Sequence, residues 1–470
     1  MSHGYPNLQN PVFLKKLYML KKCHICKPWF SMLGDRFPNF LSRMGISFEI
    51  LSIFAKKKIR LPMIRSNFLP LAFLFFLVCA CAQNISKETE QERIPIFVYH
   101  AIPEKFTDIE HYQEMADAGI TLSTPVLDSI DFIIKALDYS AATGTKAVVS
   151  CNDFENRTEE FVAKVKDHPG LGGYFLADEP GTGSFEWLAE WVERIRKIDP
   201  DTTHLLYVNL LPIYAFSGEE EYREHLETYC DKMPLPYISF DYYPVLWDKE
   251  NERIVASPFW YQNLQMVADM AKKTGRRLSG FALATAHSLF PVPTMAHLRF
   301  QTYTNLAYGA QSLQYFTYYT PKCYDENDFH LGPITRKGKR SQVYEILREM
   351  NQELQQLAFV FMGSKMESVY HLGDSLPVGT TALRELPAHF LQLNTHGKNA
   401  LVSTLSKGNE KFVVLVNGSP VDPLSVDIET DSVVKRVRRD GSLVRADLYD
   451  VEYSIEPGSC EIFTYSTLSK

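Results

Sequence analysis

Eight short apolar runs, each followed by a helical or turn segment, fill the chain between Arg93 and about residue 321. Runs that are apolar throughout, rather than alternating, are typical of parallel strands buried on both faces. Strands that alternate with helices predict an α/β fold, and eight such units predict a (β/α)8 TIM barrel over residues 93–362. The runs lie at residues 94–102, 119–126, 145–153, 171–180, 204–212, 236–245, 277–287 and 312–321.

A doubly wound open sheet is the main alternative to the barrel. That fold favours a glycine-rich phosphate loop after the first strand, and "FVYHAIPEKF" contains no glycine. Helix ends are marked between the runs. Gly144 and Gly275 lie where C-terminal glycines belong, and Ser217 with Glu220 fits a capping box at a helix start.

The pattern of the chain changes after about Gly363. Short β-rich segments such as "NALVSTL" and "KFVVLVNGSP" follow one another, joined by turn residues such as "RRDGS". This pattern predicts a small C-terminal antiparallel β-sandwich domain over residues 363–470.

The first 92 residues contain a targeting signal. "MIRSNFLPLAFLFFLVCAC", which starts at Met63, has a basic residue, an apolar run and then small residues, as in a secretory signal peptide. "LVCAC" resembles a bacterial lipobox with Cys81 as the lipidated residue and Cys79 as the other candidate, and residues 82–92 would be a tether. We therefore predict an exported lipoprotein with a signal peptide over residues 63–81, anchored to the membrane in the periplasm or at the cell surface; a plain cleaved signal is the alternative. We interpret residues 1–62 as an N-terminal extension that lies upstream of the true translation start, which we expect at Met63.

Charge is distributed unevenly along the chain. Residues 1–62 hold 11 Lys and Arg against 2 Asp and Glu, and Arg65 adds one more positive charge. Because the net charge of the whole chain is −7, the part from Cys81 onward carries a net charge of −17. An acidic body argues against nucleic acid as a partner, because phosphate binding needs clustered basic residues. The lone C-x-x-C of Cys23 and Cys26 has no second pair, and we predict no metal site and no cofactor.

Polar and aromatic residues follow the ends of the predicted strands, where the working residues of such barrels gather. Aromatic faces stack on sugar rings, and carboxylates and amides bind hydroxyl groups, so these residues predict a carbohydrate site. The predicted substrate-binding residues are Tyr99, Asn152, Asp153, Asp178, Asn209, Tyr243, Trp247, His287 and Tyr318.

The segment "GYFLADEP" resembles the strand-four signature of clan A glycoside hydrolases, in which Asn-Glu-Pro ends the strand and the Glu is the general acid/base. Glu179 and Pro180 match that signature, and Asp178 stands where the family has Asn. "YISFDYYPV", residues 297–321 and "IEPGSCEIFTY" also resemble the later strands and the accessory β-domains of these enzymes, so the resemblance covers roughly residues 93–467. It implies a hydrolase that cleaves a poly- or oligosaccharide with Glu179 as general acid.

Two carboxyl groups are needed for glycoside hydrolysis. Strand geometry predicts that the side chains of Asp178 and Glu179 point to opposite sides, which favours Asp178 as a substrate ligand rather than as the second acid. The clan carries its nucleophilic Glu at the end of strand seven, but "FALATAHSLFPVP" has no carboxylate there.

We therefore predict Asp241, at the end of strand six, as the second catalytic carboxylate, with Asp153 as the next candidate. A buried structural acid is the other interpretation of Asp241. A barrel that binds glycans without cleaving them is the alternative function. The residues leave open the sugar, its linkage, the stereochemical outcome and the oligomeric state.

Overall fold

The computed structural model describes residues 92–322, 328–448 and 452–468. The predicted signal peptide, the lipidated Cys81 and the extension over residues 1–62 lie outside these residues. All of these described residues fall within one compact unit. Within the described ranges, no helix is both long and apolar enough to cross a membrane.

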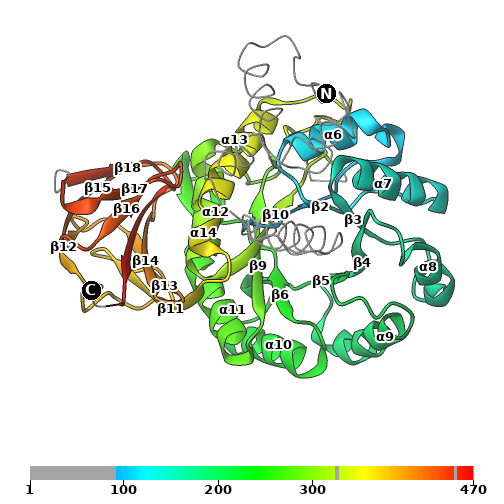
Figure 1. Cartoon of the computed structure of the whole chain (residues 1–470), viewed down its shortest axis with the longest axis horizontal. Helices are drawn as coiled ribbons and strands as arrows, with labels where there is room; N and C mark the ends of the chain where they lie inside the picture. Colours follow the sequence, from blue (N-terminus) through cyan, green and yellow to red (C-terminus); the bar gives the residue numbers. More distant parts are fainter. Residues whose placement is uncertain (1–91, 323–327, 449–451, 469–470) are drawn as a thin grey trace, which may run out of the picture. The chain divides into compact units, whose positions relative to one another are not determined.

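The predicted (β/α)8 barrel is confirmed. Eight parallel strands pair in the order β5-β4-β3-β2-β1-β10-β9-β6, with helices around them (Figure 1). The amide of Leu210, just after β5, donates to the carbonyl of Ser239 on β6 at 2.8 Å, and this contact brings the two edges of the sheet together. The strands are β1 Ile96–Tyr99, β2 Leu122–Ser123, β3 Lys146–Val149, β4 Leu171–Asp178, β5 Leu205–Asn209, β6 Tyr237–Phe240, β9 Arg277–Leu283 and β10 Ala310–Phe316.

Helices cover the barrel because each buries one apolar stripe against the strands. In α9, for example, Phe185, Leu188 and Ile195 recur at helical spacing and are fully buried. The helices are α6 Ile109–Asp117, α7 Ile130–Thr143, α8 Thr158–Val165, α9 Phe185–Ile198, α10 Glu219–Lys232, α11 Trp260–Thr274, α12 Met295–Ala307, α13 Gln342–Gln356 and α14 Ala358–Phe361.

The predicted helix ends agree with the structure in two of three places. Gly144 and Gly275 end α7 and α11 with φ of +73° and +69°, a left-handed conformation that glycine adopts without strain. The predicted capping box was wrong, because α10 begins after Gly218 without a side-chain cap. Glu221, rather than Glu220, accepts the amide of Ser217, since the helix starts one residue later than the box requires.

The C-terminal β-sandwich is also confirmed. A six-stranded antiparallel sheet, in the order β11-β13-β14-β19-β16-β17, faces a three-stranded sheet, β12-β15-β18. Apolar residues such as Val413, Val426 and Phe463 fill the space between them. The strands are β11 Lys365–Leu372, β12 Phe390–Asn394, β13 Ala400–Lys407, β14 Glu410–Asn417, β15 Leu424–Thr430, β16 Lys435–Val437, β17 Leu443–Arg445, β18 Glu452–Ile455 and β19 Cys460–Ser466.

Candidate functional site

The end of β4 departs from regular strand geometry at two points. The register between β4 and β5 shifts between Phe175 and Ala177, so that Asp178 lies opposite Asn209. One residue later, Glu179 adopts a left-handed backbone with φ of +50°, and its amide donates to the carbonyl of Asn209 at 2.8 Å. The expectation that the two acids point to opposite sides is not supported, because the left-handed Glu179 interrupts the regular alternation of the strand.

Asp178 accepts hydrogen bonds from two side chains on neighbouring strands. The hydroxyl of Tyr99, at the end of β1, donates to Oδ2 at 2.9 Å, and Nδ2 of Asn209 donates to Oδ1 at 3.3 Å. The residue as a whole is exposed, but the carboxyl group of Asp178 is enclosed by these two partners. Burial of the group raises the pKa of Asp178, and the two hydrogen bonds oppose that shift by stabilising the ionised form.

Asn209 links Asp178 to Asp241. Its Nδ2 also donates to Oδ1 of Asp241 at 3.1 Å, so one amide nitrogen serves both carboxyl groups. Tyr243 donates a long hydrogen bond of 3.4 Å to the other oxygen of Asp241. The structure thus brings together four predicted residues from the ends of β4, β5 and β6.

Glu179 and Asp241 share a hydrogen bond between their carboxyl groups. Burial, followed by the negative charges of Glu179 and Asp178, raises the pKa of Asp241 well above its usual range. Burial and the charge of Asp178 also raise the pKa of Glu179, which the hydrogen bond from Asp241 partly offsets. Two adjacent carboxyl groups do not readily ionise together, so this pair retains a proton that isolated carboxyl groups would release.

Tyr99 and Tyr243 line the site with aromatic rings. The ring of Tyr99 packs against Phe175, Phe281 and Phe316, and the ring of Tyr243 also packs against Phe281 and Phe316. Burial raises the pKa of both phenols, and the negative charges of Asp178 and Asp241 raise it further. Both tyrosines therefore remain neutral hydrogen-bond donors.

Sequence reasoning missed Tyr214, which lies in a short helical turn after β5. The residue is 60% exposed. Burial of its hydroxyl raises the pKa of Tyr214, and the negative charges of Asp241 and Glu179 raise it further. The ring packs edge-on against Tyr242 with centroids 5.1 Å apart. Its place in "LLPIYAF", five residues beyond Asn209, was the only signal in the sequence.

The end of β9 carries no carboxylate where the clan has its nucleophile, but a buried Thr285 and a half-buried His287. Thr285 is fully buried and hydrogen-bonded to Thr317 at 2.8 Å. His287 packs against Phe290, Phe316 and Phe329, and burial lowers its pKa. His287 thus belongs to the aromatic lining and touches neither Glu179 nor Asp241 through any described hydrogen bond.

Four predicted residues lie outside this cluster. Asn152 and Asp153 are exposed in the loop after β3, where Asp153 accepts a hydrogen bond from Asn156 at 2.6 Å. Trp247 is 40% exposed on the hairpin of β7 Val245–Asp248 and β8 Arg253–Ala256. The prediction that Tyr318 binds substrate is not supported, because its ring is fully buried in the barrel core.

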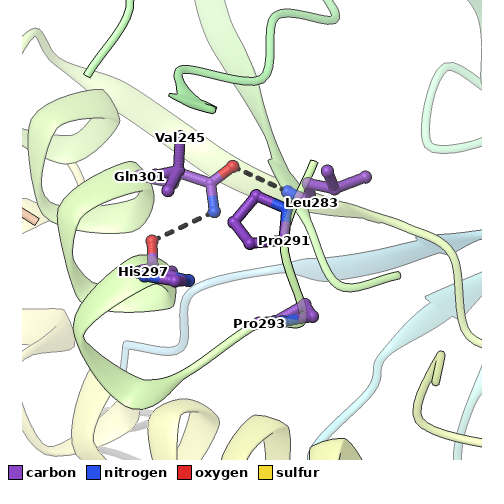
Figure 2. A pocket seen from close by; sticks show the side chains of 6 residues that line it. All are labelled: Val245, Leu283, Pro291, Pro293, His297 and Gln301. Carbon is purple, nitrogen blue, oxygen red and sulfur yellow. Dashed lines mark hydrogen bonds between the residues drawn. The ribbon is translucent and has the colours of Figure 1, made fainter. Parts of the chain in front are cut away.

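A small pocket lies between the end of β9 and α12 (Figure 2). Gln301 crosses it: its Oε1 accepts the amide of Leu283 at 2.8 Å, and its Nε2 donates to the carbonyl of His297 at 3.0 Å. Val245, Pro291 and Pro293 complete the lining. None of the clustered acids lines this pocket, so we place the candidate site at the acids rather than here.

The described residues offer no group of three or more His, Cys, Asp or Glu arranged to hold a metal ion. In the same ranges, no Lys or Arg is among the groups that perturb Asp178, Glu179 or Asp241. The site can therefore hold a proton between two carboxyl groups and bind hydroxyls through an acidic, aromatic surface.

Neither a protein-family model nor a curated protein matches the sequence. Solved structures do match the fold. A β-galactosidase from Bacillus circulans sp. alkalophilus aligns over 80% of this chain and 100% of its own, with a TM-score of 0.52 and 9% identity. A GH42 β-galactosidase from G. stearothermophilus aligns over 79% of this chain and 98% of its own, with a TM-score of 0.50 and 8% identity.

A third match is shorter. The β-galactosidase from the psychrophilic Marinomonas ef1 aligns over 57% of this chain and 60% of its own, with a TM-score of 0.43 and 13% identity. The chain thus spans less than two thirds of that enzyme. At such identities the shared property is the fold, a barrel followed by β-structure.

Proposed function

We propose that this protein is a glycoside hydrolase that cleaves a poly- or oligosaccharide, with Glu179 as general acid and Asp241 as the second carboxylate. The observation that carries the proposal is the hydrogen-bonded pair of these two side chains at the carboxyl ends of β4 and β6. Such a pair holds the proton that a departing sugar oxygen requires. Solved glycosidases with the same fold support the proposal.

The two members of the pair have different environments. Asp241 is the more enclosed, and it has the more strongly raised pKa, whereas Glu179 is exposed. In our proposal the proton passes along the hydrogen bond to Glu179, which faces the substrate. Glu179 then gives the proton to the glycosidic oxygen as the bond between that oxygen and the anomeric carbon breaks.

Water completes the reaction. The carboxylate of Asp241 accepts a proton from a water molecule, whose oxygen bonds to the anomeric carbon. Inverting enzymes leave about 6.5–9.5 Å between their carboxyl groups for this water. Because Glu179 and Asp241 are in contact without substrate, the side chain of Glu179 must turn toward the sugar on binding. A water activated in this way by Asp241 would give inversion, which NMR of the first-formed anomer tests directly.

The charges around the site favour neutral sugars. Three carboxyl groups repel an anionic ring, and no cation among the described residues perturbs them. We therefore expect neutral hexosides to be cleaved in preference to uronic acids.

The decisive experiment compares two variants on a glycan panel. We expect Glu179→Gln to lower kcat/KM by about 100-fold or more, because the amide cannot donate the proton. Glu186→Gln, an exposed acid in the first turn of α9, should hydrolyse at the wild-type rate. Wild-type turnover by Glu179→Gln would refute the assignment.

A second candidate is a glycan-binding protein without hydrolytic activity. The neutral Thr285 and His287 at the end of β9 favour it, since the clan has its nucleophile there. Binding to the panel without new reducing ends would select this function.

We also propose that the protein is exported and anchored through a lipid on Cys81, the last residue of the lipobox-like "LVCAC". Cys81→Ala should move the protein from the membrane fraction to the soluble fraction. An unchanged distribution would remove the anchor from the proposal.

A further inference from the structure

A chain of hydrogen bonds runs through the barrel interior beneath the acid pair. Tyr207 on β5 donates to Oε1 of Gln314 on β10 at 2.8 Å, and Nε2 of Gln314 donates to Oγ of Ser239 on β6 at 2.7 Å. Ser239 in turn donates to Oδ1 of Asn209 at 2.8 Å. Asn209 ends the chain by donating to Asp178 and Asp241.

The direction of this chain is fixed by its chemistry. An ionised carboxylate only accepts hydrogen bonds, so the Asn209 amide must present its nitrogen to Asp178. Its oxygen then faces Ser239, whose single hydroxyl proton satisfies it. Ser239 is then left as an acceptor, and the amide nitrogen of Gln314 donates to it at 2.7 Å.

Burial makes reversal of the chain costly. Ser239 is fully buried, Asn209 is 1% exposed and Gln314 is 2% exposed. Water does not replace a lost partner at such positions, so a flipped amide leaves unsatisfied groups. A flipped Asn209 would also turn its oxygen toward two carboxyl groups.

We propose that Ser239 and Gln314 are positioning residues, which hold the Asn209 amide so that its nitrogen faces Asp178 and Asp241. This inference rests on the proposed function for its catalytic meaning, since the two acids belong to that site. Neither residue touches the substrate; both act through Asn209.

The test follows carboxyl titration in the full chain by infrared spectroscopy without substrate, with Asp241→Asn used to assign the bands. Ser239→Ala removes the donor that holds the Asn209 amide, so the hydrogen bonds from Asn209 to the carboxylates weaken and the carboxyl titration should move upward by about one pH unit. Ser279→Ala is the matched control, because Ser279 lies beside Ser239 in the sheet register and bonds to Ser312 instead. It should leave the titration unchanged.

A double-mutant cycle separates positioning from general loosening of the core. If Ser239 acts through Asn209, then Ser239→Ala should add no further shift in an Asn209→Ala background. If Ser239→Ala does not fold, Gln314→Met replaces it and should give a smaller shift of the same sign. An unchanged titration, a shift equal to that of Ser279→Ala, or full additivity would overturn the inference.

The same variants separate this inference from the proposed function. If hydrolysis is detected, the acid limb of the pH–rate profile should move upward in Ser239→Ala together with the infrared titration. A titration that shifts as expected in a protein that cleaves no glycan would retain the positioning role and reject the hydrolase.

Discussion

At the residue scale, the site depends on one backbone angle. Glu179 has φ of +50°, a conformation that costs a non-glycine residue about 1 kcal/mol or more. The left-handed turn lets adjacent acids join one cluster, with Asp178 bonded to Tyr99 and Glu179 bonded to Asp241. The carboxyl groups of Asp178 and Glu179 therefore belong to one cluster, although a regular strand would direct them to opposite faces.

The raised pKa of Asp241 predicts how stability depends on pH. Burial raises the pKa of Asp241 in the folded state above its unfolded value near 4. The folded protein then holds a proton that the unfolded chain releases, so this contribution to stability is full below about pH 4 and declines as the pH rises toward the folded pKa. We expect Asp241→Asn to flatten this decline, measured as Tm between pH 4 and 8. An identical slope would contradict the shift.

Tyr214 offers a second test at this scale. Its ring is exposed and lies within electrostatic reach of both proposed catalytic acids, so we expect it to stack on the bound sugar. Tyr214→Ala should raise KM about 10-fold, whereas Tyr214→Phe, which keeps the ring, should stay near the wild-type value. Equal effects of the two substitutions would indicate a role for the hydroxyl instead.

At the element scale, β4 determines where the acids lie. Its bulge places Asp178 opposite Asn209, and Gly173 makes the close pairing with β5 possible. Gly173 has φ of +151°, and a Cβ there would lie 1.9 Å from the carbonyl oxygen of Leu205. Because that oxygen belongs to the backbone of β5, the clash cannot be relieved by a side-chain rotation.

We expect Gly173→Ala to cost about 3 kcal/mol or more, since the two strands must separate. Gly181→Ala, in the loop after the acids, is the matched control, because a Cβ at Gly181 meets nothing within 4 Å. Urea unfolding followed by circular dichroism measures both. Equal midpoints would show that β4 accommodates the side chain.

At the scale of the whole molecule, an ion-pair network joins the barrel to the β-sandwich. Arg299 on α12 bonds to Glu353 on α13 at 2.6 and 3.1 Å, and to Glu456, which follows β18, at 2.5 Å. Arg299 and Glu353 are 13% and 12% exposed. Ser403 on β13 adds a hydrogen bond of 2.7 Å to the carbonyl of Ala307.

Arg299→Met should therefore destabilise the protein by about 3–5 kcal/mol, because it leaves Glu353 enclosed without its counter-charge. The control is Arg157→Met, which removes an exposed pair with Glu160 and should cost less than about 1 kcal/mol. Differential scanning calorimetry measures both. A similar small loss in the two variants would show that water compensates Glu353.

The residue pattern alone predicts the barrel, the sandwich and the strand that carries the acids. Continuous apolar runs separated by helical segments permit few other folds, and β11 to β19 follow the turn-rich pattern after Gly363. It also placed Glu179, Asp178, Asn209 and Asp241 at strand ends, where barrel topology gathers side chains. The prediction that Tyr318 binds substrate is not supported, because a position near a strand end does not tell whether the ring faces the barrel mouth or the helices.

How those residues meet depends on strand pairing, which the residue pattern does not specify. The register shift in β4 and the left-handed backbone of Glu179 have no signal in the residue pattern. Closure of the barrel makes β4, β5 and β6 neighbours. Glu179 then contacts Asp241, and the amide of Asn209 lies between two acids. The physical reason is that a pattern of period two fixes the face of a side chain only while the strand stays regular.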